Sequence, residues 1–141
     1  MPKFRFSEVA RLMAVSDDTV RRWVDAGRLT STQDSAGRKV VDGAELAEFA
    51  KTQAHSMEDT SGVARSARNQ FVGLVTEVTA DKVMAQVEMQ CGPYRVVSLM
   101  STEAVQELGL APGVLAVAVV KSTSVVVEVA EIAARVDELP A

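Results

Sequence analysis

The stretch FSEVARLMAVSDDTVRRWVDAGRL, residues 6–29, decides the fold of the first third of the chain. Its apolar residues recur every three to four positions on either side of a break at residues 14–16, which is the period of amphipathic helices. Ser7 and Ser16 are the expected caps of the two helices, because a serine hydroxyl accepts a free amide of the first turn. Gly27 stands where helices commonly end. The stretch therefore predicts two short helices joined by a tight turn.

The residues that follow predict a small hairpin and a third helix. Segment 30–41 has Gly37 in its middle and β-branched residues at its end, which is typical of two short strands around a turn. Asp42 is the expected cap of a short helix through residues 44–50, where the apolar positions return to a helical period.

Two helices joined by a tight turn are the parts of a helix-turn-helix, whose second helix enters the major groove of DNA. Val20 and Trp23 of the second helix are expected to point inward and to pack on Val9 and Leu12. Arginine side chains on the opposite face can grip a phosphate or read guanine through two hydrogen bonds. The candidate DNA-binding residues, all polar or cationic and on the second helix or the hairpin, are Ser16, Thr19, Arg21, Arg22, Arg38 and Lys39.

Residues 4–51 resemble the winged helix-turn-helix of the MerR and excisionase families, in which a segment like TVRRWVDAGRL forms the recognition helix and its end. The resemblance implies double-stranded DNA as the partner. It also implies DNA contacts from Arg21 and Arg22, with Arg38 and Lys39 in the wing. The long dimerisation helices and effector cysteines of MerR proteins are absent, so metal–thiolate sensing is not implied.

The length, composition and charge of the chain fit two small domains. The chain has 141 residues, of which 48% are hydrophobic but only 4% aromatic, so any core consists mainly of Val, Ala, Leu and Met. Residues 1–55 carry nine Lys/Arg and eight Asp/Glu, a net charge of +1, whereas residues 56–141 carry six and eleven, a net charge of −5, so the negative charge lies in the second half. The first half is compatible with nucleic acid if its cations share one face. A domain of roughly 60–70 residues has a marginal core, which favours self-association.

The sequence argues against an enzyme, a secreted protein and a membrane protein. Cys91 is the only cysteine and has no partner for a disulfide or at metal-ligand spacing, and the only histidine, His55, lies in a polar segment. No nucleophile–base set, phosphate loop or metal-ligand cluster appears. No apolar run resembles a signal peptide or reaches 18 residues. We therefore expect a cytoplasmic protein that is not an enzyme, has no membrane partner and uses no metal-cation cofactor.

The composition changes near residue 52. Residues 52–64 are small, polar and aperiodic, which is typical of a linker. A short helix is expected from Ser101 to Leu108, ended by Gly109 and with Ser101 or Thr102 as its cap. Strands are expected at about 70–79, 82–90, 94–99, 115–121 and 123–130. The fold class is therefore α+β, with a winged helix-turn-helix domain at 1–51, a linker at 52–64, an OB-like five-stranded β-barrel domain at 65–130 and a tail at 131–141.

Three segments of the second half, SARNQFVG at 66–73, ELGLAPG at 107–113 and KSTSV at 121–125, occur in an order that resembles the molybdate-binding Mop domain. Mop (TOBE-like) domains occur in molbindins, in molybdate-responsive regulators and in transporter ATPases, and the resemblance covers about residues 64–130. It implies a homo-oligomer, a dimer or larger, with anion sites between subunits. It also implies a hydroxyl ligand at Ser101.

Molybdate, like tungstate, is an unprotonated tetrahedral dianion that offers only hydrogen-bond acceptors, so a selective site needs donors alone. Backbone amides in a turn can complete such a set. The candidate oxyanion-binding residues supply hydroxyls, amides and two cations: Ser66, Ala67, Arg68, Asn69, Ser101, Lys121, Ser122, Thr123 and Ser124. The expected ligand is molybdate or tungstate.

Three functions fit this organisation. The first is a transcriptional regulator that binds DNA through one domain and responds to molybdate or tungstate through the other. The second is an intracellular molybdate-binding or storage protein in which the helix-turn-helix serves assembly. The third is a protein-binding adaptor of a molybdenum enzyme or transporter. Selective binding to DNA distinguishes the first from the second, and a co-purified partner would favour the third.

Overall fold

The computed structural model of the protein describes residues 2–54 and 62–129. The chain divides into two compact units, the first including residues 2–54 and the second including residues 62–126. Each unit has a buried apolar cluster of its own. Most of the expected linker and the whole expected tail, residues 131–141, lie outside the described residues.

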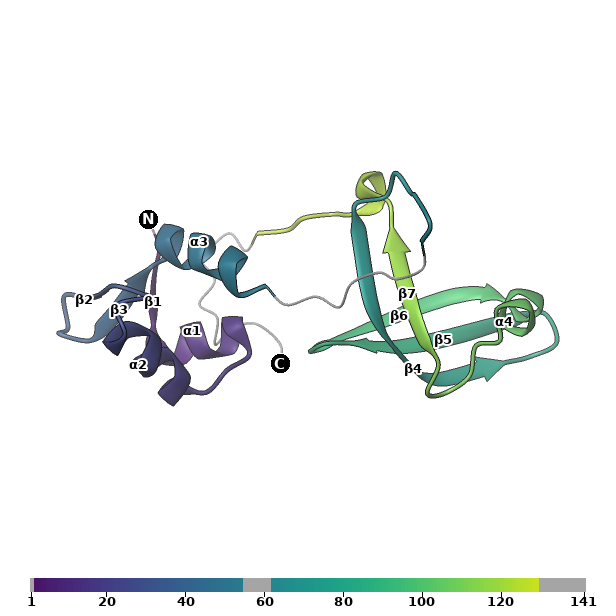
Figure 1. Ribbon diagram of the computed structural model, residues 1–141, viewed down its shortest axis with the longest axis horizontal. Helices are drawn as coiled ribbons and strands as arrows, with labels where there is room; N and C mark the ends of the chain where they lie inside the picture. Colours follow the sequence, from purple (N-terminus) through teal and green to yellow (C-terminus); the bar gives the residue numbers. More distant parts are fainter. Residues whose placement is uncertain (1, 55–61, 130–141) are drawn as a thin grey trace. The chain divides into compact units, whose positions relative to one another are not determined.

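Residues 2–54 form three helices and a small antiparallel sheet (Figure 1). The strand order is β1–β3–β2, so the start of the chain extends the β2–β3 hairpin on its free side. The helices and the hairpin were predicted, whereas β1 was not, because three residues carry no periodic signal. The elements in chain order are β1 (Lys3–Arg5), α1 (Phe6–Met13), α2 (Asp17–Asp25), β2 (Ser31–Gln33), β3 (Lys39–Asp42) and α3 (Gly43–Gln53).

The caps fix where the helices of this unit begin. The Ser16 hydroxyl accepts the amide of Thr19 at 3.2 Å, which confirms the predicted cap of α2. The predicted Ser7 cap of α1 was wrong, since Arg5 is the capping residue. Glu8 explains the difference, because its carboxylate accepts the Arg5 amide at 2.8 Å and also contacts the Arg5 guanidinium at 3.0 Å. A glutamate three residues into a helix satisfies the amide before the first turn.

The other helix ends of the first unit are also set by residues close to them in sequence. Asp42 caps α3 as predicted, accepting the amide of Glu45 at 3.2 Å. Helix α3 continues to Gln53, so the first two residues of the expected linker are helical. The turn between α1 and α2 passes through Ala14, whose φ of 55° lies in the left-handed region that non-glycine residues rarely adopt.

The core of the first unit joins the two helices to α3 and the sheet. Val9 and Val20 are fully buried, and Trp23 packs edge-on against Phe49 with ring centroids 4.8 Å apart. Leu12 was expected in this core, but it is 44% exposed. In an eight-residue helix the buried stripe is narrow, and Val9 and Ala10 already occupy it.

Residues 62–129 contain an antiparallel sheet in the order β6–β5–β4–β7, which curls as Figure 1 shows. Four of the five expected strands and the helix ended by Gly109 are confirmed, and Ser101 is the residue that caps this helix. The elements in chain order are β4 (Asn69–Ala80), β5 (Met84–Cys91), β6 (Tyr94–Ser101), α4 (Thr102–Leu108), β7 (Leu115–Val120) and the 3₁₀ turn η1 (Ser122–Ser124).

Strand β5 begins at Met84, two residues later than predicted. The cause is Asp81, whose side-chain oxygen accepts the amides of Val83 at 2.7 Å and Met84 at 2.8 Å. These bonds occupy the turn between β4 and β5 with a local side-chain–backbone loop that competes with strand pairing. Because the Met84 and Val83 amides bond to the charged form of the carboxylate, the pKa of Asp81 lies below its usual value.

The fifth expected strand, 123–130, was wrong over the residues that the structure describes. Residues 122–124 form η1, and residues 125–129 have no regular structure and are exposed. The valines there give a strong strand signal, but a strand needs a partner edge, and over residues 2–54 and 62–129 no strand is paired with them. The described second unit is therefore a curled four-stranded sheet and not a five-stranded barrel.

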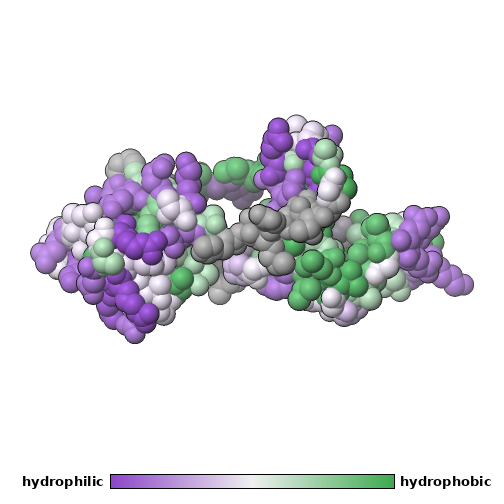
Figure 2. Space-filling view, in the orientation of Figure 1, coloured by the Kyte–Doolittle hydropathy of each residue, from purple (hydrophilic) through white to green (hydrophobic). Residues whose placement is uncertain are grey.

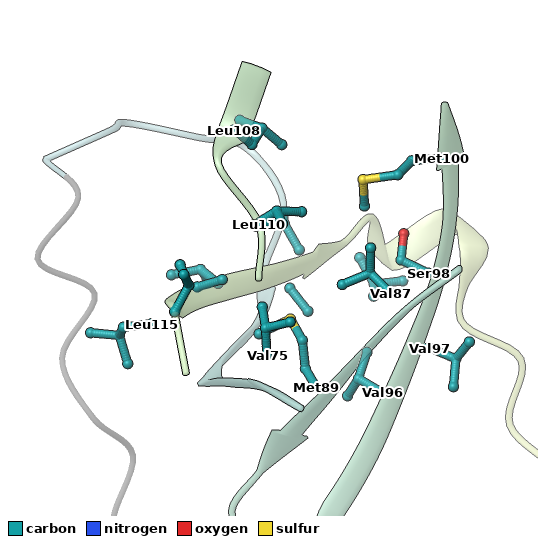
Figure 3. Close-up of a pocket in the computed structure, with 16 residues that line it drawn as sticks. Val75, Val87, Met89, Val96, Val97, Ser98, Met100, Leu108, Leu110 and Leu115 are labelled. Atoms are coloured by element: carbon teal, nitrogen blue, oxygen red, sulfur yellow. The ribbon is translucent and has the colours of Figure 1, made fainter. Parts of the chain in front are cut away.

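One face of the curled sheet is a hollow lined by apolar side chains. Side chains from β5, β6 and the α4–β7 connection converge on it, among them Met89, Met100 and Leu110 (Figure 3). Its volume is about 470 Å³. Figure 2 shows apolar residues gathered on the surface of this unit, which includes Leu115 and Val119 among its exposed hydrophobic residues. The second unit thus leaves part of an apolar core uncovered.

Candidate functional site

The exposed face of α2 carries the predicted DNA-reading arginines. Arg21 and Arg22 are both exposed, while Val20 is fully buried, so the inward and outward faces of the helix are as expected. The Arg21 guanidinium contacts the Asp18 carboxylate at 3.4 Å. Ser16 and Thr19 bond to each other through their hydroxyls at 3.0 Å, and both are engaged in capping the helix. The arginines are therefore the stronger candidates for contact with DNA.

The β2–β3 hairpin presents the other two predicted cations, Arg38 and Lys39, both exposed. Asp34 organises the turn by accepting the amides of Ala36 and Arg38 at 2.9 Å each. Its second oxygen accepts the Arg38 Nε–H, also at 2.9 Å. The backbone bond from Arg38 is the main reason why the pKa of Asp34 lies below its usual value. The Asp34 carboxylate thus neutralises the positive charge of Arg38, and Lys39 is the cation of the hairpin that is more available to DNA.

Strand pairing brings together two of the segments predicted to bind an oxyanion. Asn69, the first residue of β4, pairs with Val120, the last residue of β7, and the Asn69 side chain donates to the Val120 carbonyl at 3.2 Å. Segments 66–69 and 121–124 therefore meet at one end of this strand pair, although more than 50 residues separate them in sequence (Figure 1).

The donors of these two segments lie at the surface. Ser66 and Arg68 are exposed on either side of Ala67, which is buried and whose carbonyl accepts the Gln70 side-chain amide at 3.3 Å. Ala67 thus anchors the segment, and its neighbours face solvent. Residues 121–124 are all exposed, and the amides that open the η1 turn make no bond within it. Together the two segments offer hydroxyls, amides, a guanidinium and an ammonium, and no carboxylate.

Ser101 does not join this group within one chain. It pairs with Met84, near the far end of β4, whereas Asn69 begins that strand. Its hydroxyl accepts the Ala104 amide at 3.0 Å and caps α4. Sequence spacing carried no information on which end of the sheet Ser101 would occupy. Its predicted ligand role is therefore compatible only with a site built from more than one copy of the chain.

Two site residues were not anticipated from the sequence. Asp18 and Asp34 each contact a predicted DNA-binding arginine, at 3.4 Å and 2.9 Å respectively. The only available signal was their spacing, three residues before Arg21 and four before Arg38, which places opposite charges side by side in a helix or around a tight turn. Exposed pairs of this kind are common, and spacing alone did not connect them to a function.

The described residues show neither a metal-binding cluster nor a membrane-spanning helix. Over residues 2–54 and 62–129, no group of three or more His, Cys, Asp or Glu side chains is arranged to hold a metal ion. Over the same residues, no helix has the length and apolar character needed to cross a membrane.

Comparison with known proteins gives separate matches for the two halves of the chain. The family model of the helix-turn-helix domain matches residues 4–54, and that of the TOBE domain matches residues 65–127. Molybdenum-pterin-binding protein 2 of Clostridium pasteurianum is 40% identical over 63 residues, which are 44% of this chain and 93% of that protein. Molybdenum-pterin-binding protein 3 of the same bacterium is 38% identical over 63 residues, with the same coverage.

Among solved structures, the cytoplasmic molybdate-binding protein ModG, in a form with molybdate bound, is 39% identical and superposes with a TM-score of 0.43. The match covers 48% of this chain and 49% of ModG.

Proposed function

The chain belongs to the TOBE (Mop-like) family of molybdenum-pterin-binding proteins through residues 65–127, and we propose that it is a DNA-binding transcriptional regulator that responds to molybdate. The matches at residues 4–54 and 65–127 confirm a helix-turn-helix domain and a Mop-like TOBE domain, as the sequence predicted. The observation that carries the proposal is that both domains occur in one chain, each with its own core and its own exposed cationic donors.

The donor set at the start of β4 and the end of β7 supports molybdate as the ligand. Arg68 and Lys121 would supply positive charge, and Ser66 and Ser122 would supply hydroxyl donors to the oxygens. A site without a carboxylate favours an anion that never donates, and disfavours phosphate, which is partly protonated near neutral pH. Tungstate has nearly the same shape as molybdate, so we expect it to bind as well, whereas the smaller sulfate fits less well.

Assembly of the chain would complete both the site and the core. Val126 and Val129 are 81% and 87% exposed, and the outer edges of β6 and β7 have no strand partner among the described residues. A second copy that laid residues 125–129 along such an edge would bury these valines and cover the apolar hollow. We therefore propose a homo-oligomer with anion sites between subunits. Deleting residues 125–141 is expected to lower the number of subunits in the oligomer, measured as its molar mass by light scattering, and to abolish molybdate binding.

The first unit supports DNA as the partner. Arg21 and Arg22 project from the second helix of a helix-turn-helix, which is the element that enters the major groove in this class of domain. Lys39 and Arg38 stand on the hairpin, where a wing contacts the backbone or minor groove. Anion binding between subunits would set the spacing of two such domains, and half-sites on DNA lie about 34 Å apart per helical turn. The proposal involves neither catalysis nor a metal-cation cofactor.

A pair of double variants tests whether the two activities belong to separate domains. Replacing Arg21 and Arg22 by Ala is expected to abolish salt-dependent DNA binding and to leave molybdate binding unchanged. Replacing Arg68 and Lys121 by Ala is expected to do the reverse. DNA binding is measured by fluorescence anisotropy on fragments of the protein's own promoter region, and molybdate binding by calorimetry.

The same experiment separates the proposal from its main alternative. A chain that binds molybdate tightly but shows no sequence-selective binding to DNA at any salt concentration would be a storage protein. Folded double variants that each lose both activities would contradict the assignment of the two activities to separate domains.

A further inference from the structure

The exposed stripe of α2 carries as many negative charges as positive ones. Asp18, Arg21, Arg22 and Asp25 are all exposed, and their spacing of three, four and seven residues places them along one side of the helix. The stripe therefore runs from an aspartate, through two arginines, to a second aspartate. For phosphate contact alone the aspartates are unfavourable, since each repels the DNA backbone.

Asp18 differs from Asp25 in its position and its contact. It is the second residue of α2, in the half of a recognition helix that reaches base edges, whereas Asp25 is the last residue. One oxygen of Asp18, Oδ1, accepts a hydrogen bond from Arg21 Nη1 at 3.4 Å. A carboxylate has two oxygens with about four acceptor positions between them, so this contact leaves Oδ2 able to accept a further donor.

On this basis, and resting on the proposed DNA-binding function, we propose that Asp18 sets the base preference of the recognition helix. Its Oδ1 holds the Arg21 guanidinium in the orientation that reads the O6 and N7 of a guanine. Its Oδ2 accepts the N4 amino group of a neighbouring cytosine, the only base whose major-groove edge offers a donor without an adjacent acceptor of its own. Asp18 is thus both a positioning residue for Arg21 and a specificity-determining residue.

The proposal makes a distinct prediction about sequences that lack this cytosine. With guanine or thymine at that position the Asp18 carboxylate meets only acceptors and repels them, and with adenine it meets the N7 acceptor beside the N6 donor, so its removal should strengthen binding most to sequences with guanine or thymine there while it weakens discrimination. A residue that merely stabilised the helix N-terminus would change affinity for all sequences by the same factor.

The test uses the full chain and a library of randomised 20-base-pair duplexes, from which the wild type and Asp18→Asn select their preferred sites. The wild type is expected to select a guanine and a neighbouring cytosine in each half-site. Asp18→Asn is expected to lose the cytosine, with discrimination at that position falling by about fivefold to a hundredfold. Asp25→Asn removes the same charge from the same stripe and is the matched control, expected to raise affinity for all duplexes alike.

The outcomes separate this inference from the function on which it rests. An Asp18→Asn site identical to the wild-type site, or an equal change of preference in Asp25→Asn, would overturn the role of Asp18 alone. A wild type that selects no sequence would overturn the regulator proposal and this role together. Trp23 emission shows whether the variants are folded, and Asp18→Ser is the second variant should Asp18→Asn unfold.

Discussion

Replacing Gly73 by Ala tests how closely β4 lies against the end of β5. A Cβ at this position would lie 2.3 Å from the carbonyl oxygen of Gln90 and 2.7 Å from Sγ of Cys91. Ordinary contacts begin at 3.4 Å. The nearer atom belongs to the backbone and cannot rotate away, so the two segments must separate by about 1 Å in an interior that is packed like a crystal.

The cost follows from this displacement. Forcing one extra carbon into a packed core typically destabilises by about 1–3 kcal/mol. Alanine regains about 0.5–1 kcal/mol, because it restricts the unfolded chain more than glycine does. Since the obstruction is backbone, we expect the upper part of the range, and a net loss of about 2 kcal/mol in the stability of the second unit.

The lone tryptophan provides an internal control for this variant. Trp23 lies in the core of the first unit, so its emission follows that unit, while far-UV circular dichroism follows both. In urea, Gly73→Ala should lower the midpoint of the β-sheet transition and leave the Trp23 transition in place. Adding Cys91→Ala removes the contact with Sγ but not the one with the Gln90 carbonyl, so it should rescue only part of the loss. A neutral Gly73→Ala, or complete rescue by Cys91→Ala, would refute the reasoning.

Three further outcomes are expected. Ala14→Gly relieves the left-handed backbone at φ 55° and should raise the free energy of unfolding of the first unit by about 0.5–1 kcal/mol in the Trp23 transition; a loss would mean that this turn is not strained. Burial raises the pKa of the Cys91 thiol, so in the folded chain at pH 8 it should react with a thiol reagent much more slowly than in urea, and equal rates would show an open site. Because the pKa of Asp34 is lowered in the folded chain, its contribution to stability is present above about pH 4 and is lost as the pH falls below that value. The free energy of unfolding of the first unit, followed by Trp23 emission, should therefore fall less steeply below about pH 4 in Asp34→Asn than in the wild type.

The local features of the first unit were largely available from the sequence. Ser16 correctly predicted the start of α2, because a capping hydroxyl bonds to an amide only three residues away and so can be recognised from the local sequence. The start of α1 was misplaced because Ser7 and Glu8 both suit a helix N-terminus, and the competition is decided by how the Glu8 carboxylate meets the backbone of Arg5. Leu12 was misassigned since periodicity gives the direction of a side chain but not the extent of the surface that covers it.

The features that the sequence could not supply are those that depend on pairing. Valines at 125–129 have the composition of a strand, but a strand forms only against a partner edge, and among the described residues these valines are paired with none. The meeting of Asn69 with Val120, and the separation of both from Ser101, follow from the strand order, which no local pattern encodes. The two segments predicted to bind an oxyanion were chosen from the Mop resemblance and their residue types, and only the fold shows that they lie close together.

Titration calorimetry with molybdate, carried out on the full chain with and without its DNA site, asks whether the two domains act together. A regulator that responds to molybdate should bind the anion tightly, give no heat with sulfate or phosphate, and change its molybdate affinity when DNA is bound. Linkage requires that molybdate then changes the DNA affinity by the same factor. The absence of molybdate binding, or a molybdate affinity that is the same with and without DNA, would contradict the proposed function.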